Sequence, residues 1–318
     1  MSSLSLKRIA GKPWLWSWLA AALIFIASLV ASQGVGAGSL LTAALGFSAF
    51  FVIVGIGQLL VISTGPGNID LSIPANVALT GAIGMKLMDS QNDLIWLGLL
   101  GVLAAGILIG CANYALIRLL RIPPIIATLS ASFLLQSMAI AYGRSVRIQP
   151  PEAFYGFATG RVLGIPYLAL AVAALAVMMG YVLSRTLYGR WTLAVGQNPR
   201  AAELAGVRVG RVRFATYVLS AVFASLCGVL LAGFSGGASL SMGDEYLLAS
   251  IAVVVIGGTS VAGGYSNIPG LWGAALFLYL LVSMLNSFGA SAGVRLILTG
   301  VIIIAVICAM SGRKGARA

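Results

Sequence analysis

Ten long apolar runs dominate this sequence, and the short segments between them carry most of the charge. A helix needs about 20 apolar residues to cross the hydrocarbon core of a bilayer, where its backbone groups must bond internally. The third and eighth runs are short and flanked by glycine. The pattern predicts an all-α integral membrane protein with about ten transmembrane helices, at approximately 14–32, 40–62, 71–88, 94–117, 122–142, 166–184, 213–235, 246–262, 269–287 and 294–311.

The composition agrees with a membrane domain. Hydrophobic residues make up 60% of the chain and charged residues 8%, whereas soluble domains are about 25% charged. No long polar linker divides the chain, so we expect a single transmembrane domain over 14–311, between an N-terminal tail (1–13) and a basic tail (312–318). The first apolar run resembles a signal peptide, but about 19 residues can span a bilayer, and we interpret it as an uncleaved helix.

The orientation follows from the basic residues. With the N-terminus in the cytoplasm, fourteen of the nineteen Lys and Arg residues lie on the cytoplasmic side, and the exceptions are Lys86, Arg144, Arg147, Arg161 and Arg295. The positive-inside rule therefore predicts an even number of spans with both termini cytoplasmic. The same placement accounts for the net charge of +12 without a nucleic-acid partner.

The longest cytoplasmic segment in this topology is 185–212. Within it, Asn198 is expected to cap a helix that begins at Pro199 and ends at Gly206. A basic connector that only enforces topology is one interpretation. Small residues on an exposed short helix instead favour docking into a groove of another protein, and the candidate docking residues are Gly196, Asn198, Ala201, Ala202, Glu203 and Gly206.

Two segments repeat at an offset of 195 residues. The match aligns Thr64 with Thr259 and Ile73-Pro74 with Ile268-Pro269. In the predicted topology both segments follow an outward-to-inward helix, so a parallel internal repeat about the membrane normal is one explanation. Chance similarity of small and turn-forming residues is the other.

These repeated segments also hold the candidate solute pathway. Asp70 is the only acidic residue before Asp89, and ionisable groups near membrane depth usually face a cavity, a partner or the interface. Either an unwound segment lines the pathway, or Asp70 or Ser72 simply caps the following helix. The glycine-rich second segment lacks the lysine of a phosphate loop, and a packed helix break is its alternative interpretation. The candidate pathway residues are Thr64, Asn68, Asp70, Ser72, Gly258 and Thr259.

Three motifs resemble a known family over about residues 45–310. They are Gly189-Arg190 followed by the run 194–207 (Ala-Val-Gly-Gln-Asn-Pro-Arg-Ala-Ala-Glu-Leu-Ala-Gly-Val), the run 251–264, and Asn68-Ile-Asp-Leu-Ser72. The sequence resembles permease subunits of bacterial ABC importers of the ribose and monosaccharide type, which include autoinducer-2 and inositol carriers. It departs from the family at Pro66-Gly67-Asn68, where two adjacent glycines are usual.

The resemblance implies a multi-pass protein of a bacterial inner membrane, with 185–212 as the coupling loop. It also implies a second permease subunit, identical or related, and cytoplasmic ATPase subunits that bind ATP and magnesium. A periplasmic binding protein would deliver a monosaccharide or similar small polar solute. This chain itself is then neither an enzyme nor a cofactor protein. The absence of histidine and the isolation of its cysteines agree with that expectation.

One alternative function is an ion-coupled secondary transporter of small solutes. Such carriers commonly place carboxylates at membrane depth, and only Asp70 meets that requirement here. Uptake into vesicles without any ATPase would support this alternative.

Overall fold

A computed structural model describes residues 13–143 and 148–289, together with 291, 293–294, 297–298, 300–302 and 304–305. Seven helices in this part are long and apolar enough to cross a membrane. They confirm seven of the predicted spans, with small shifts at their ends. These helices are α2 (Pro13–Ala31), α3 (Ala37–Ser63), α5 (Ile95–Leu119), α6 (Pro124–Gly143), α8 (Tyr167–Arg185), α11 (Val209–Phe234) and α13 (Ile268–Ser287).

Two shorter apolar helices stand at the third and eighth predicted spans. They are α4 (Ile73–Met88) and α12 (Tyr246–Ile256). The prediction of one helix over 246–262 was too long, because Gly258 adopts a φ of +91° that ends the helical path. The tenth predicted span, 294–311, lies largely outside the described residues.

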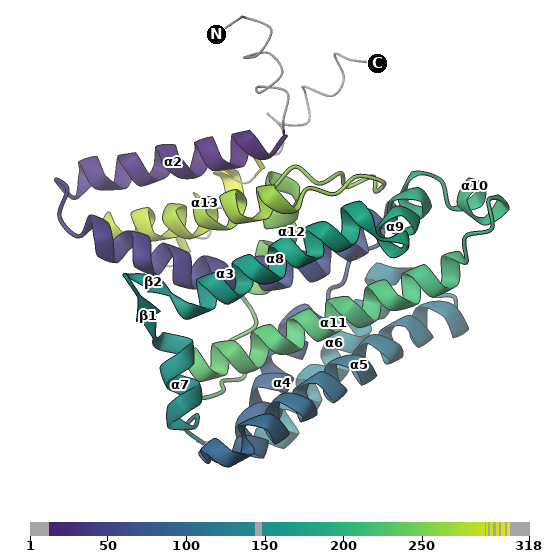
Figure 1. The fold of residues 1–318 in the computed structure, drawn as a ribbon, viewed down its shortest axis with the longest axis horizontal. Helices are drawn as coiled ribbons and strands as arrows, with labels where there is room; N and C mark the ends of the chain where they lie inside the picture. Colours follow the sequence, from purple (N-terminus) through teal and green to yellow (C-terminus); the bar gives the residue numbers. More distant parts are fainter. Residues whose placement is uncertain are drawn as a thin grey trace, which may run out of the picture.

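Helices α3 and α11 join the two halves of the bundle. Figure 1 shows α13 and α8 beside α3, with α2 packed on α13; α4 and α5 pack on α11, and α6 packs on α4. Helix α3 is buried at every position from Val52 to Ser63. A helix that is apolar around its whole circumference belongs in the interior of a large bundle, and α3 is that central helix here.

Close helix contact depends on small residues. Gly106 and Gly110 of α5 face α11, where a Cβ on Gly110 would lie 2.5 Å from the Cα of Val218 and one on Gly106 would lie 2.7 Å from Ser225 Oγ. This is the small-xxx-small spacing that lets backbones approach in membranes. Neither site accommodates a larger residue without moving α11.

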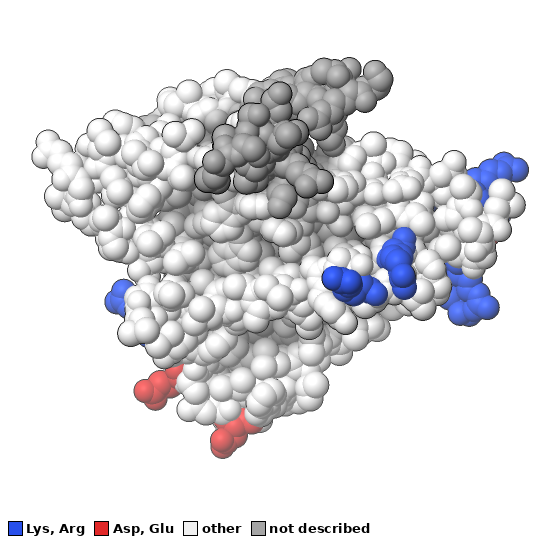
Figure 2. All heavy atoms as spheres, turned by 45° about the horizontal axis from the view of Figure 1, so that its top comes forward, with Lys and Arg blue, Asp and Glu red and all other residues white. Residues whose placement is uncertain are grey.

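The two ends of the bundle differ in structure and charge. At one end lie η1 (Asn92–Leu94), α7 (Glu152–Thr159) and a hairpin of β1 (Arg161–Val162) with β2 (Ile165–Pro166). At the other end lie α9 (Leu187–Gln197) and α10 (Pro199–Leu204) (Figure 1). Figure 2 shows most Lys and Arg side chains in view gathered at one end and the acidic side chains in view at the opposite end. One short helix was predicted in 185–212, and the structure has two because Thr186 caps a further helix, α9.

Candidate functional site

Helix α10 has the predicted caps. Asn198 Oδ1 accepts a hydrogen bond of 3.0 Å from the backbone N–H of Ala201, and Pro199 occupies the first turn. Gly206, at a φ of +85°, donates its N–H to the carbonyl of Glu203. Local sequence thus specifies where this short helix starts and stops.

The candidate docking residues divide between the surface and the interior. Asn198, Ala201, Glu203 and Gly206 are exposed. Ala202 is buried with Val195, Val207 and Val212 in a small core between α9, α10 and α11. The side chain of Ala202 therefore packs within this chain, while its exposed neighbours remain accessible to a partner.

Leu204 is the largest apolar side chain of α10, and it is not among the residues predicted from the sequence. Its side chain is 84% exposed. The one signal in the sequence is that Leu204 is a leucine within an otherwise short and polar helix.

Gly196, at the end of α9, lies inside a three-way junction. A Cβ there would overlap the carbonyl oxygen of Ser63 and the backbone nitrogen of Gly264. These two backbone atoms form a hydrogen bond of 3.0 Å with each other. A Cβ on Gly263 would likewise overlap the backbone of Gly65, at 2.5 Å from its Cα. The repeated segments after α3 and α12 therefore meet each other at the end of α9, where only glycine fits.

Gly258 and Thr259 lie in the loop that follows α12. Thr259 Oγ accepts from the N–H of Asn267 at 3.1 Å, and Asn267 Nδ2 donates to the carbonyl of Gly257 at 2.7 Å. Thr64 instead bonds back to Val61, within its own helix end. The paired threonines of the repeat therefore occupy similar places but make different bonds, and the repeat stays a prediction.

Asp70 lies in the interior, where its carboxylate accepts three hydrogen bonds. Ser72 donates from its N–H (3.0 Å) and its hydroxyl (2.6 Å) to Oδ1, and Ser220 of α11 donates to Oδ2 at 2.8 Å. The N–H of Asp70 donates to Gln58 Oε1 of α3 at 3.3 Å. Asn113 Nδ2 of α5 donates to Ser72 Oγ at 2.8 Å. We call these five residues the Asp70 cluster, and it connects α3, α5 and α11 to the start of α4.

The hydrogen bonds of Asp70 differ from those of a helix cap, which was one of the two predicted roles for Asp70 or Ser72. Ser72 is the residue before the first turn of α4, and its side chain makes no capping bond. Asp70 binds the N–H of Ser72, so it orders the approach to the helix instead of its first-turn amides. Asn68 lies beside the cluster, where its Oδ1 accepts from the Tyr217 hydroxyl at 3.4 Å.

All the candidate pathway residues are buried in this conformation. Asp70 is 1% exposed, Ser72 is fully buried, and Gln58 and Asn113 are also fully buried. Within the described chain, Gln58 Nε2 and Asn113 Oδ1 have no hydrogen-bond partner. Unsatisfied polar atoms in an interior are costly, so the cluster retains unused donor and acceptor capacity in a closed space.

Gln58, Asn113 and Ser220 were not selected from the sequence. Each is a polar residue within an apolar run, which is the only signal that the sequence offers. They belong to three different helices, so only the fold shows that they meet. Among the described residues, no group of three or more His, Cys, Asp or Glu side chains could hold a metal ion.

The chain is similar to known transport proteins over most of its length. Residues 40–307 match the family described as "Branched-chain amino acid transport system / permease component". The chain is 31% identical over 260 residues to the ribose import permease protein RbsC of Escherichia coli (strain K12), covering 80% of each chain. It is 32% identical over 258 residues to RbsC of Bacillus subtilis (strain 168), covering 80% of this chain and 79% of that one. It is 30% identical over 273 residues to the fructose import permease protein FruF of Bifidobacterium longum (strain NCC 2705), covering 84% and 76%. No solved structure gives a significant match.

Proposed function

This chain belongs to the transport-system permease family that it matches over residues 40–307, and from that premise we propose that it is the transmembrane subunit of an ABC importer for a monosaccharide or similar small polar solute. It is a multi-pass protein of the inner membrane. The relatives named above import ribose or fructose. That common chemistry, a small molecule rich in hydroxyl groups, is the solute class that we propose here.

The proposed coupling element is α10. An ATPase subunit on the cytoplasmic side would receive the exposed face of this helix, with Leu204 as its apolar anchor and Ala201 and Gly206 allowing close approach. A partly apolar, capped helix outside the lipid suits insertion into a groove. The observation that carries this proposal is the 84% exposure of Leu204 on a helix whose other apolar side, Ala202, is already packed within the chain.

The proposed solute pathway passes the Asp70 cluster. Its buried amides and hydroxyls match the hydrogen-bonding groups of a sugar, and their unused bonding capacity supports a role beyond packing. A solute could reach them only after α3, α4 and α11 separate. Motion of α9 would be transmitted through the glycine junction formed by Gly65, Gly196, Gly263 and Gly264.

Transport then depends on a difference in contacts between two states. ATP binding shifts the equilibrium only if the ATPase contacts α10 differently in the outward-open and inward-open forms. The ATPase subunits would hold ATP and magnesium, and this chain would hold neither. A second permease subunit would complete the pathway, and a periplasmic binding protein would deliver solute at the end formed by α7, β1 and β2.

The test is uptake and co-purification with the intact transporter in cells. Replacing Leu204 with Glu should reduce the amount of ATPase that co-purifies with the permease and should abolish ATP-dependent sugar uptake. Insertion of the variant into the membrane should be unchanged. Leu163→Glu is the matched control for ATPase co-purification, because Leu163 is 98% exposed at the opposite end. ATPase retained at wild-type levels by the Leu204→Glu variant would reject the role of α10. Uptake by permease alone in vesicles would reject the importer.

A further inference from the structure

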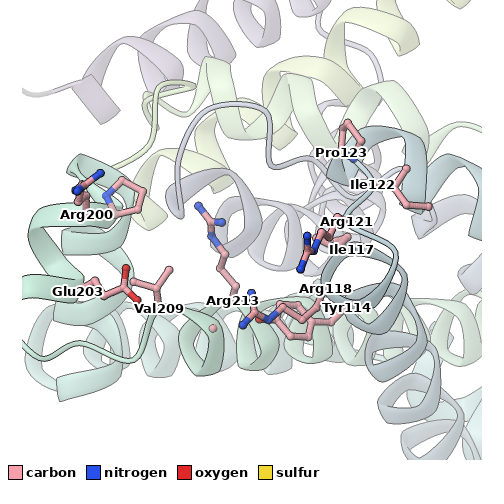
Figure 3. A pocket seen from close by; sticks show the side chains of 12 residues that line it. Tyr114, Ile117, Arg118, Arg121, Ile122, Pro123, Arg200, Glu203, Val209 and Arg213 are labelled. Carbon is pink, nitrogen blue, oxygen red and sulfur yellow. The ribbon is translucent and has the colours of Figure 1, made fainter.

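An open cavity of about 730 Å³ lies at the arginine-rich end of the molecule. It is bounded by the end of α5, the turn into α6, helix α10 and the first turn of α11. Arginine dominates its polar lining. The charged residues around it are Arg118, Arg121, Arg200, Arg213 and a single glutamate, Glu203 (Figure 3).

The guanidinium groups of this cavity have no ion-pair partner among the described residues. Arg213 is the most constrained, since its Nε is buried and makes no hydrogen bond. Figure 3 shows Arg213 projecting between Arg200 and Arg121. A buried guanidinium donor without an acceptor is unfavourable, and the planar donor groups of arginine match phosphate oxygens.

The backbone at the start of α11 also favours an anion in this cavity. Val209 and Gly210, the first two residues of the 26-residue helix α11, line the cavity. No side chain caps this N-terminus. The first turn of a long helix carries partial positive charge and free N–H groups, which favour an anion.

A topological role alone does not explain the arrangement. Cytoplasmic arginines that only enforce orientation can occupy any position in their loops. Arg185, Arg190 and Arg211 lie in the same cytoplasmic segments and do not line the cavity. The four that do come from three separate parts of the chain and converge on one space.

We propose that this cavity binds a phosphate-bearing ligand on the cytoplasmic side. The ligand would join α10, through Arg200, to the α5–α6 turn, through Arg118 and Arg121. Two sources share this chemistry. One is the headgroup of an anionic lipid, whose chains would lie along the exposed side chains of Leu119, Leu120 and Ile126. The other is a soluble phosphate ester of the cytoplasm. The cytoplasmic placement rests on the topology proposed above.

The test uses the purified full-length permease, without ATPase, in phosphatidylcholine nanodiscs. One arm adds inorganic phosphate or glucose 6-phosphate against chloride of equal ionic strength, and the other replaces part of the lipid with phosphatidylglycerol. Thermal unfolding and native mass spectrometry report binding. We expect one probe to stabilise the wild type. The same probe should bind Arg213→Gln about tenfold more weakly than the wild type, which is the loss of affinity expected when one charge-assisted hydrogen bond is removed.

Two further variants keep the result interpretable. Arg118→Gln changes an exposed cavity residue, where substitutions cost little folding stability, so it should weaken binding even if Arg213→Gln is unstable. Arg211→Gln removes an exposed arginine outside the cavity and should bind like the wild type. Stabilisation by soluble phosphate identifies the ester, and stabilisation only by phosphatidylglycerol identifies the lipid.

Equal response of the wild type and both cavity variants would overturn the proposal. The proposal would also be overturned if neither probe bound to the wild type. If Arg118→Gln and Arg213→Gln then weakened association with the ATPase, the cavity would be a protein-docking surface. None of these measurements needs transport, so their failure is distinct from failure of the importer function.

Discussion

Ser220 donates a hydrogen bond of 2.8 Å to the carboxylate of Asp70, although the two residues stand 150 positions apart in the chain. This bond connects the middle of α11 to the irregular segment before α4. No arginine or lysine among the described residues pairs with Asp70. Both carboxyl oxygens of Asp70 are held by hydroxyl and amide donors, which a sugar could replace one by one.

Asp70→Asn separates a transport role from a packing role. The amide keeps an acceptor for Ser72 but loses the charge and part of the bond from Ser220, and we expect normal membrane insertion with sugar uptake near the level of cells lacking the permease. Ser220→Ala removes the same interhelical bond, worth roughly 1.5–3 kcal/mol when the acceptor is charged, and leaves the carboxylate. Uptake kinetics in cells compare the two. Equal loss in both variants would show that Asp70 only ties α4 to α11.

Gly196→Ala should uncouple the transporter. The added Cβ would overlap Ser63 O and Gly264 N, so α9 must move away from the junction of the two repeated segments. We expect the ATPase to remain bound while sugar no longer stimulates ATP hydrolysis, as measured in reconstituted vesicles. Gly180→Ala is the control, because a Cβ there meets nothing within 4 Å. Full stimulation in Gly196→Ala would contradict a transmission role for the junction.

Gly110→Leu should separate α5 from α11. Overpacking a close helix contact costs about 1–3 kcal/mol, and here the obstacle is the backbone of Val218 and Tyr217 instead of a flexible side chain. The expected result is a lower melting temperature of the detergent-purified protein. Gly180→Leu, on an open helix surface, should melt like the wild type, and matching losses in both variants would reject the specific contact.

Asn198→Ala should weaken α10 without removing its docking face. Loss of an N-cap costs about 1 kcal/mol, which lowers the population of the formed helix, and we expect a partial loss of ATP-dependent uptake. Asn198→Asp keeps the acceptor for Ala201 N–H and should restore uptake. If uptake by Asn198→Asp were as low as uptake by Asn198→Ala, the side chain of Asn198 would act through something other than the helix cap.

Much of the candidate coupling element followed from the sequence, and much of the interior did not. Asn198, Pro199 and Gly206 define α10 because a cap is made by residues within a few positions of one another. The same local logic missed α9, since its start depends on Thr186, a weaker signal beside an apolar run. It also could not tell that Ala202 faces inward, because that depends on where Val212 of α11 lies.

Contiguous residues were enough to predict that the chain lies in a membrane, where seven of its spans run, and how α10 is capped, because hydrophobic length and capping are local properties. The fold was needed to show that Asp70 contacts Ser220 and Gln58, that Asn113 contacts Ser72, and that Gly196 fits against Ser63 and Gly264. Those contacts join positions far apart in the chain. They depend on how the helices pack, and the hydropathy pattern along the chain does not predict which distant polar residues come together in the interior.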